Sequence, residues 1–134
     1  MSGVAWSKEY ELGNDFVDSQ HKRLFELVNN ISAACNDGQD VKKLNETLDF
    51  LLQYTVQHFA DEEAFQIKCN FPDYERHKQL HEDFKETVTE KVAEFREKGS
   101  TKYLSDTVNK IVVKWLVNHI LMEDMKIGVH VKSL

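Results

Sequence analysis

The stretch LNETLDFLLQYTVQHFADEEAF, residues 44–65, decides how this chain folds. Its inward-facing positions recur at alternating spacings of four and three residues, which is the period of one face of an α-helix. This series consists of Leu44, Leu48, Leu51, Thr55, His58, Glu62 and Phe65. The pattern predicts a long helix whose apolar face is interrupted by two ionisable residues, His58 and Glu62, one helical turn apart.

Three further segments have the same period, and residues that favour turns separate them. The turn signals are Gly13, residues 36–38, residues 70–72, residues 98–100 and Gly128. The inward series are Val17, His21, Leu24, Val28 and Ile31 in the first segment; Tyr74, His77, His81, Phe84, Val88, Lys91 or Val92, and Phe95 in the third; and Leu104, Val108, Ile111, Trp115, His119 and Met122 in the fourth. We therefore expect an all-α fold, an antiparallel up-down-up-down four-helix bundle with an extended N-terminal arm.

Length and composition narrow the class of protein. The 134 residues suit a single domain over residues 1–134, and 41% hydrophobic with 30% charged residues is typical of a soluble protein. A net charge of -6 disfavours nucleic acid as a partner. Neither a leader peptide nor a membrane-spanning apolar run is visible, so we expect a cytoplasmic protein. Cys35 and Cys69 lack the spacing of a metal or redox pair and are expected to be reduced thiols.

Every predicted helix places ionisable residues on its inward face. His77 and His81 are four residues apart, as are His58 and Glu62, so each pair projects side by side from one helix. His21 in the first segment and His119 in the fourth bring the number of inward imidazoles to five. A single inward histidine is usually a satisfied core residue, but an unpartnered one costs several kcal/mol, and five on four helices point to a common ligand. A metal centre accounts for all of them together.

The donor set indicates which metal centre this is. Five imidazoles with carboxylates exceed what one tetrahedral zinc ion binds, so two ions are implied. Nitrogen and oxygen donors without thiolate favour iron or manganese, with zinc and copper open, and iron is preferred. No histidine has Glu three positions before it, which disfavours the ferritin-like di-iron bundles. No His-Asp dipeptide occurs, which weakens a hydrolytic interpretation.

These motifs resemble the hemerythrins, most closely the stand-alone bacterial members called bacteriohemerythrins. The resemblance spans nearly the whole chain and is carried by Trp6, DSQHKRLFELVN around His21, HFADEE from His58, YERHKQLH through His77 and His81, and WLVNHILMED through His119 to Asp124. It implies that one iron ion is bound by His77, His81 and His119, and the other by His21 and His58. It also implies that Glu62 and Asp124 bridge the two irons with an oxo or hydroxo group, and that the second iron keeps an open position for dioxygen.

Asp124 is assigned by this resemblance alone. It lies five residues after His119, where a regular helix would present Glu123 or Met122 closer to the histidine. For Asp124 to reach the metals, the helix must widen between His119 and Gly128.

Several neighbours of these positions have expected supporting roles. An apolar oxygen pocket that excludes water is predicted from Leu24, Phe25, Phe59, Trp115, Leu116 and Ile120. Candidates to orient the imidazoles are Asp18, Gln20, Asp61 and Glu82, among which the sequence does not choose. His130 lies outside the pattern and is expected in an exposed tail.

The resulting hypothesis is a binding protein rather than an enzyme. It predicts reversible dioxygen binding for storage, transport or delivery, with an oxygen-consuming protein as recipient and the chain as a monomer. The alternatives are an oxygen or redox sensor, a di-iron enzyme such as an oxidase, peroxidase or nitric-oxide-handling protein, and iron storage, which a fixed pair of sites serves poorly. The chain ends shortly after Asp124 without an output domain, which favours a carrier over a sensor.

Overall fold

A computed structural model describes residues 5–36, 41–98 and 101–134, and all regular structure in these ranges is helical. The elements are η1 (Lys8–Tyr10), α1 (Asp15–Asn36), α2 (Val41–Lys68), α3 (Tyr74–Lys98), α4 (Thr101–Thr107), η2 (Val108–Val113), α5 (Lys114–His119), η3 (Ile120–Asp124) and α6 (Met125–Lys132). Here η1 is a 3₁₀-helix, whereas η2 and η3 are π-helical.

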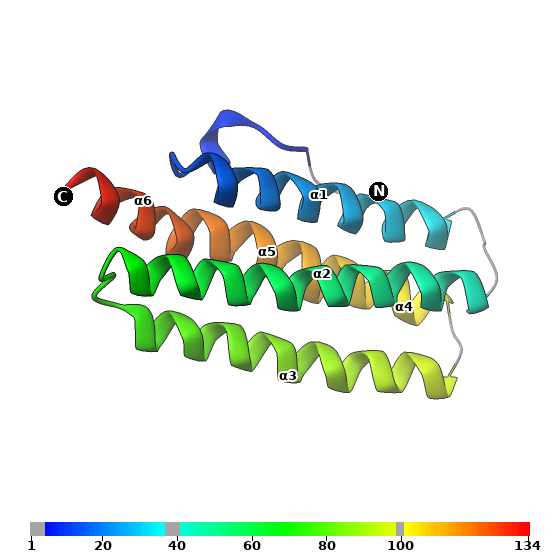
Figure 1. The fold of residues 1–134 in the computed structure, drawn as a ribbon. Helices are drawn as coiled ribbons and strands as arrows, with labels where there is room; N and C mark the ends of the chain where they lie inside the picture. Colours follow the sequence, from blue (N-terminus) through cyan, green and yellow to red (C-terminus); the bar gives the residue numbers. More distant parts are fainter. Residues whose placement is uncertain (1–4, 37–40, 99–100) are drawn as a thin grey trace.

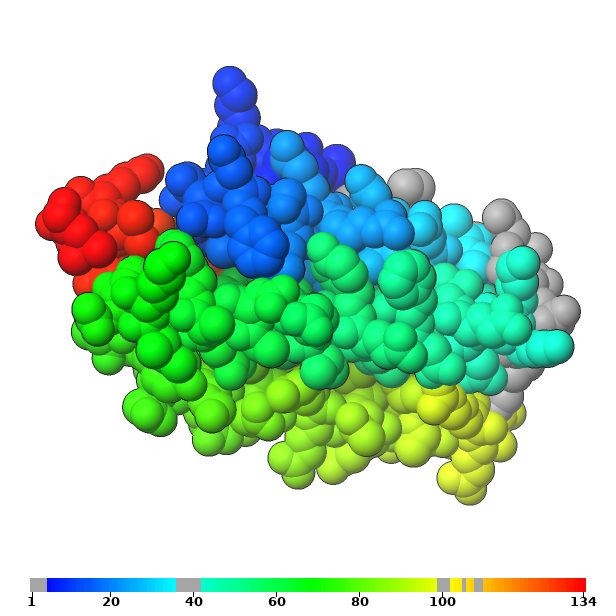
Figure 2. All heavy atoms as spheres, in the orientation of Figure 1, coloured from blue at the N-terminus to red at the C-terminus, as the bar shows by residue number. Residues whose placement is uncertain are grey.

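The helices form the predicted bundle. Elements α4 to α6 continue one another as a single rod, which runs alongside α1, α2 and α3 (Figure 1). Successive helices contact one another, and the fourth rod closes the bundle against α1. On the face seen in Figure 2, the side chains of α1, α2 and α3 cover the interior. The all-α four-helix bundle expected from the sequence is confirmed.

The N-terminal arm is fixed to the first helix. Asn14 caps α1, because its Oδ1 accepts a hydrogen bond from the Val17 amide at 3.0 Å. The Asp18 carboxylate accepts hydrogen bonds from the amides of Leu12 and Gly13 at 2.9 and 3.2 Å. The arm is not wholly extended as predicted, since η1 lets Tyr10 pack its ring 4.9 Å from that of Phe25.

The turn between α2 and α3 is held by the last helix. Asn70 adopts a left-handed φ of 57°, and the amide of Phe71 donates to the Gln66 carbonyl at 2.9 Å, which ends α2. His130 Nε2 donates to the Cys69 carbonyl at 2.7 Å. The prediction that His130 lies in an exposed tail is therefore wrong. The helix does not stop at Gly128 but continues to Lys132, which brings His130 against this turn.

Gly128 allows a close approach rather than a turn. A Cβ at this position would lie 2.3 Å from the Leu12 carbonyl oxygen, so only glycine lets α6 pack this tightly against the arm. The turn signals predicted at residues 37, 38, 99 and 100 lie outside the described residues.

The first three helices bury the predicted positions with few exceptions. The sequence left open whether Lys91 or Val92 continues the inward series of α3. Val92 does, since it is buried. In α2 the series ends differently, because Phe65 is half-buried and Gln66 is fully buried in its place. Cys35 and Cys69 are both free thiols, as expected, and Cys35 is buried.

The fourth rod departs more from the predicted series. Its π-helical segments shift the inward face, so that Met122 is 66% exposed while Trp115 and Ile111 are half-buried. From η2 onward one buried series instead recurs every fourth residue, Val112, Leu116, Ile120, Asp124 and Gly128, and His119 and Ile127 are buried beside it. In the described ranges, every helix is too short or too polar to span a lipid bilayer.

Candidate metal centre

The structure brings all seven predicted ligand residues together in the bundle interior. Each is at most 6% exposed, and the contributing elements are α1, α2, α3, α5 and η3. Their side chains form two groups in which the potential ligand atoms lie within 4.8 Å of one another. The first group comprises Glu62, His77, His81, His119 and Asp124, and the second comprises His21, His58, Glu62 and Asp124.

Glu62 divides its two oxygens between these groups. Its Oε1 lies 3.0 Å from His77 Nε2 and 3.2 Å from His81 Nε2. Its Oε2 lies 3.1 Å from His21 Nε2 and 3.3 Å from His58 Nε2. One carboxylate therefore faces both groups, with one oxygen for each.

Asp124 is divided in the same way. Its Oδ1 lies 2.9 Å from His77 Nε2 and 3.0 Å from His119 Nε2, whereas its Oδ2 lies 3.1 Å from His21 Nε2. The two carboxylates thus lie between the two sets of imidazoles.

The imidazoles of the first group converge on their Nε2 atoms. His119 Nε2 lies 3.1 Å from His77 Nε2 and 3.2 Å from His81 Nε2. Such a contact is a hydrogen bond only if one ring nitrogen carries a proton, and a neutral imidazole carries just one proton. His81 holds this proton on its outer nitrogen, since Nδ1 lies 2.8 Å from Glu63 Oε2, which can only accept. Its Nε2 then presents a lone pair inward, as a metal ligand requires.

His58 is oriented by a similar relay. Its Nδ1 donates to Gln20 Oε1 at 2.8 Å, and Gln20 Nε2 donates to Asp61 Oδ2 at 2.8 Å. Asp61 is itself fixed by Gln57, whose Nε2 donates to Oδ1 at 2.9 Å. The outer nitrogen of His58 therefore carries a proton, which leaves Nε2 as the nitrogen that can serve as a ligand in the second group. The donor set fits a pair of metal cations.

Of the four predicted orienting residues, Gln20 contacts an imidazole and Asp61 acts through Gln20, whereas the other two take no part. Asp18 holds the N-terminal arm, and Glu82 pairs with Lys85 at 2.8 Å on the surface. Glu63 takes such a role and was not predicted. Its position next to Glu62 is the only signal in the sequence, and its partner is contributed by another helix.

Without a bound metal ion, protons on His21 and His77 supply the positive charge beside the two buried carboxylates. Burial lowers the pKa of His21, but hydrogen bonds with Asp124 and Glu62 outweigh this effect and raise the pKa to about 10. The same balance raises the pKa of His77 to about 9. Burial raises the pKa of Glu62, yet the surrounding imidazoles hold this pKa well below its ordinary value. The pKa of Asp124 is lowered as well, because His119 and His21 outweigh burial and the nearby Glu62 charge.

Asp124 reaches the interior through the π-helical turn η3. The extra residue in this turn places Asp124 inward and Glu123 outward, where Glu123 pairs with Arg76. The widening predicted between His119 and Gly128 is confirmed.

An apolar cavity of about 20 Å³ lies beside the candidate ligands. This volume suits one water-sized molecule. Four predicted pocket residues line it, Leu24, Phe59, Trp115 and Leu116, together with Val28, Leu51, Thr55, Phe84 and Val112. Phe59 stacks on the His81 ring at 3.9 Å. Phe25 and Ile120 are buried but do not line this cavity; Phe25 packs against Trp6 instead, with ring centroids 5.2 Å apart.

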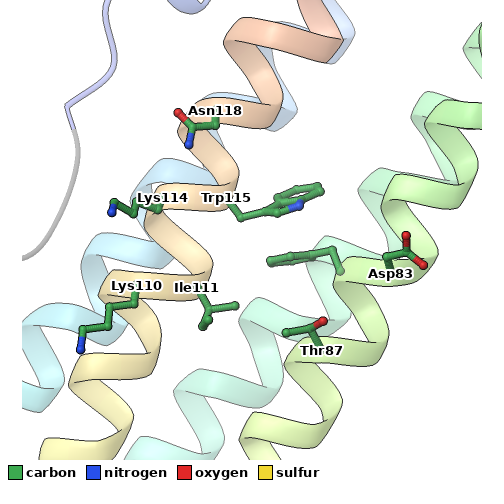
Figure 3. Close-up of a pocket in the computed structure, with 8 residues that line it drawn as sticks. Asp83, Thr87, Lys110, Ile111, Lys114, Trp115 and Asn118 are labelled. Carbon is green, nitrogen blue, oxygen red and sulfur yellow. The ribbon is translucent and has the colours of Figure 1, made fainter.

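A surface groove of about 400 Å³ lies on the other side of the same aromatic pair. Figure 3 shows it between α3 and the fourth rod, with Lys110, Lys114 and Asp83 at its edges. Phe84 and Trp115 line both spaces and stack on each other at 4.0 Å. Trp115 also stacks on His119 at 4.1 Å. The aromatic pair thus separates the apolar cavity from the surface.

Comparison with known proteins agrees with this architecture. Residues 12–129 match the family model described as the hemerythrin HHE cation-binding domain. The chain is 31% identical to a bacteriohemerythrin of Stenotrophomonas maltophilia, over 99% of this chain and 84% of the relative. It is 33% identical to a hemerythrin-like protein of Naegleria gruberi over 90% of this chain and 87% of the relative, and 31% identical to a myohemerythrin of Theromyzon tessulatum over 90% and 88%. The chain belongs to the hemerythrin family.

Proposed function

We propose that the chain binds two iron ions in its two groups of ligands and uses them to bind dioxygen reversibly. His77, His81 and His119 would hold one ion and His21 and His58 the other, with Glu62 and Asp124 between them. The observation that carries the proposal is that each carboxylate faces the two groups with a different oxygen. An iron pair supplies the electrons that dioxygen binding needs.

The two groups differ in how many ligands they offer. The first group has three imidazoles and two carboxylates, whereas the second has two imidazoles and the same two carboxylates. An ion held by His21 and His58 would therefore have one protein ligand fewer, which would leave room for a small molecule. This asymmetry supports binding at the second group.

The cavity residues favour release over onward chemistry. Among the described residues that line the cavity none is ionisable, so the cavity wall supplies no acid to protonate a bound molecule. The Thr55 hydroxyl donates to the Leu51 carbonyl at 2.8 Å and is thereby occupied. Leu24, Phe59 and Leu116 exclude water from this side.

The experiment is metal analysis combined with visible absorption. The anaerobically reduced protein is measured before oxygen, after oxygen, and after flushing with inert gas. Two irons per chain and a band that appears with oxygen and fades on flushing are expected. An irreversible change to a ferric state would contradict reversible carriage and support the sensor or enzyme alternatives, and uptake of many irons would support storage.

A polar substitution at Leu116 tests the shielding. The Leu116→Asn variant should lose its oxygen complex to autoxidation faster than the parent protein, because water and protons reach the site. An unchanged lifetime would contradict shielding by the cavity wall. A monomer in the cytoplasm that delivers oxygen to an oxygen-consuming protein completes the proposal.

A further inference from the structure

Two consecutive residues of α3 contact two consecutive residues of η3. Arg76 donates to Glu123 through both terminal guanidinium nitrogens, with Nη1 to Oε1 at 2.5 Å and Nη2 to Oε2 at 3.0 Å. One residue further on, His77 Nε2 lies 2.9 Å from Asp124 Oδ1. The first contact is at the surface, where Arg76 is 53% exposed, and the second is in the buried centre. The same π-helical turn is therefore held from outside and from inside.

Two carboxylates compete for the interior position in this turn. In a regular helix each residue turns by about 100°, so Glu123 would lie about 40° from His119 and Asp124 about 140° away. A regular helix would thus direct Glu123 inward and Asp124 outward. The extra residue of η3 reverses this choice.

We propose that Arg76 selects which carboxylate enters the centre, by holding Glu123 at the surface and so keeping η3 π-helical. Arg76 is a positioning residue, since it acts through Glu123 and the turn. A planar guanidinium that binds both oxygens of a carboxylate fixes its orientation as well as its charge. Lys126 also approaches Glu123, but through a single contact at 3.5 Å.

The chain offers a matched control for this pair. Arg96 on α3 also binds a carboxylate on a neighbouring helix, Asp49 of α2, and Arg96 is 44% exposed, close to the 53% of Arg76. Asp49 is not near any residue of the two ligand groups in sequence, and no π-helical turn adjoins it. Arg96→Met therefore measures what the loss of a surface ion pair does by itself.

The first test uses the metal-free protein. In Arg76→Met, which keeps a long side chain but removes the charge, the Cα chemical shifts and amide exchange of residues 119–125 should change towards those of a regular helix. Glu123→Gln should produce the same change with a smaller perturbation of the surface. Arg96→Met should leave residues 119–125 as they are. Unchanged shifts and exchange in both Arg76→Met and Glu123→Gln would overturn the proposal.

The second test is metal affinity, and this part depends on the proposed iron centre. Ferrous iron is titrated anaerobically in competition with a chelator. Arg76→Met should weaken binding by about 10- to 100-fold, as is typical when a residue that supports a ligand is removed. The charge-swapped pair Arg76→Glu with Glu123→Arg should recover most of the loss, whereas either swap alone should not.

The two proposals can fail separately. If the parent protein binds no iron pair, the proposed function fails while the metal-free measurement still decides the role of Arg76. If the parent binds two irons and Arg76→Met binds them within twofold of it, Arg76 is only a surface ion pair.

Discussion

Two parts of the bundle supply ligands in different ways. Helices α2 and α3 are regular, and each gives a pair of donors four residues apart, His58 with Glu62 and His77 with His81. The fourth rod gives its pair five residues apart and needs the π-helical turn η3 to direct both inward. A regular helix suffices where donors follow its period, whereas the fifth-residue spacing requires a local change of geometry together with contacts that hold it. Substitutions in each part should therefore have different consequences.

The largest expected effect is in the regular part. Glu62→Ala removes the carboxylate that faces both groups, so we expect the loss of both irons, measured by metal analysis of the purified protein. His58→Ala, which belongs to one group only, should retain the ion of the first group. Retention of two irons by Glu62→Ala would contradict a shared role.

The contacts of His21 and His77 with Asp124, where the two parts meet, should make stability depend on pH. The metal-free protein should lose a few kcal/mol of stability as the pH rises from about 6.5 to about 10. The pKa values of His21 and His77 are raised to about 10 and about 9, so their contribution is complete below the unfolded value of about 6.5 and is lost above the folded values. The lowered pKa values of Glu62 and Asp124 act oppositely, and stability should fall in acid.

Urea denaturation across this pH range measures the effect. The metal-loaded protein is the control, because its imidazoles are already deprotonated and the alkaline loss should disappear. Equal alkaline losses with and without metal would contradict the assignment to these histidines.

A third, smaller effect is expected at Gly128 in the irregular rod. Gly128→Ala should destabilise the protein by about 1–3 kcal/mol, because the new methyl group meets the Leu12 carbonyl oxygen at 2.3 Å. The usual effect of this change within a helix is a gain of about 1 kcal/mol. Chemical denaturation decides the sign. Val129→Ala, at an exposed neighbouring position, should change stability by less than about 0.5 kcal/mol.

The smallest effect is expected at Gln66 in the regular part. Gln66 is fully buried, and neither polar atom of its amide has a hydrogen-bond partner among the described residues. Gln66→Met keeps the length of the side chain and removes these polar atoms, so stability should rise by about 1 kcal/mol. Gln79→Met, on the exposed side of α3, serves as the control. A loss of stability at Gln66 would show that a buried water satisfies the amide.

The sequence was sufficient where a side chain's position follows from its own helix. The inward histidines of α1, α2 and α3 were found because a helical period of 3.6 residues places them on one face. Gln20 and Asp61 were found as candidates because they flank such positions. These predictions needed no knowledge of how the helices pack.

The sequence was insufficient where position depends on another element. Glu63 orients His81 only because α2 and α3 pack at a particular rotation, which is set by the whole bundle. His130 was placed in a tail because Gly128 normally ends a helix, whereas here it permits contact with Leu12. Asp124 was assigned by resemblance alone, because a regular helical period directs Glu123 inward.

The π-helical turn also has a consequence for changes in chain length. Deleting one residue inside a buried helix normally turns every later side chain to the wrong face. In this chain Met122 is exposed and lies in a turn that holds one residue more than a regular helix does. Its deletion would leave Asp124 four residues after His119 and keep α6 in its present register. The fourth rod is therefore a helix in which the loss of one residue at this turn restores regular geometry.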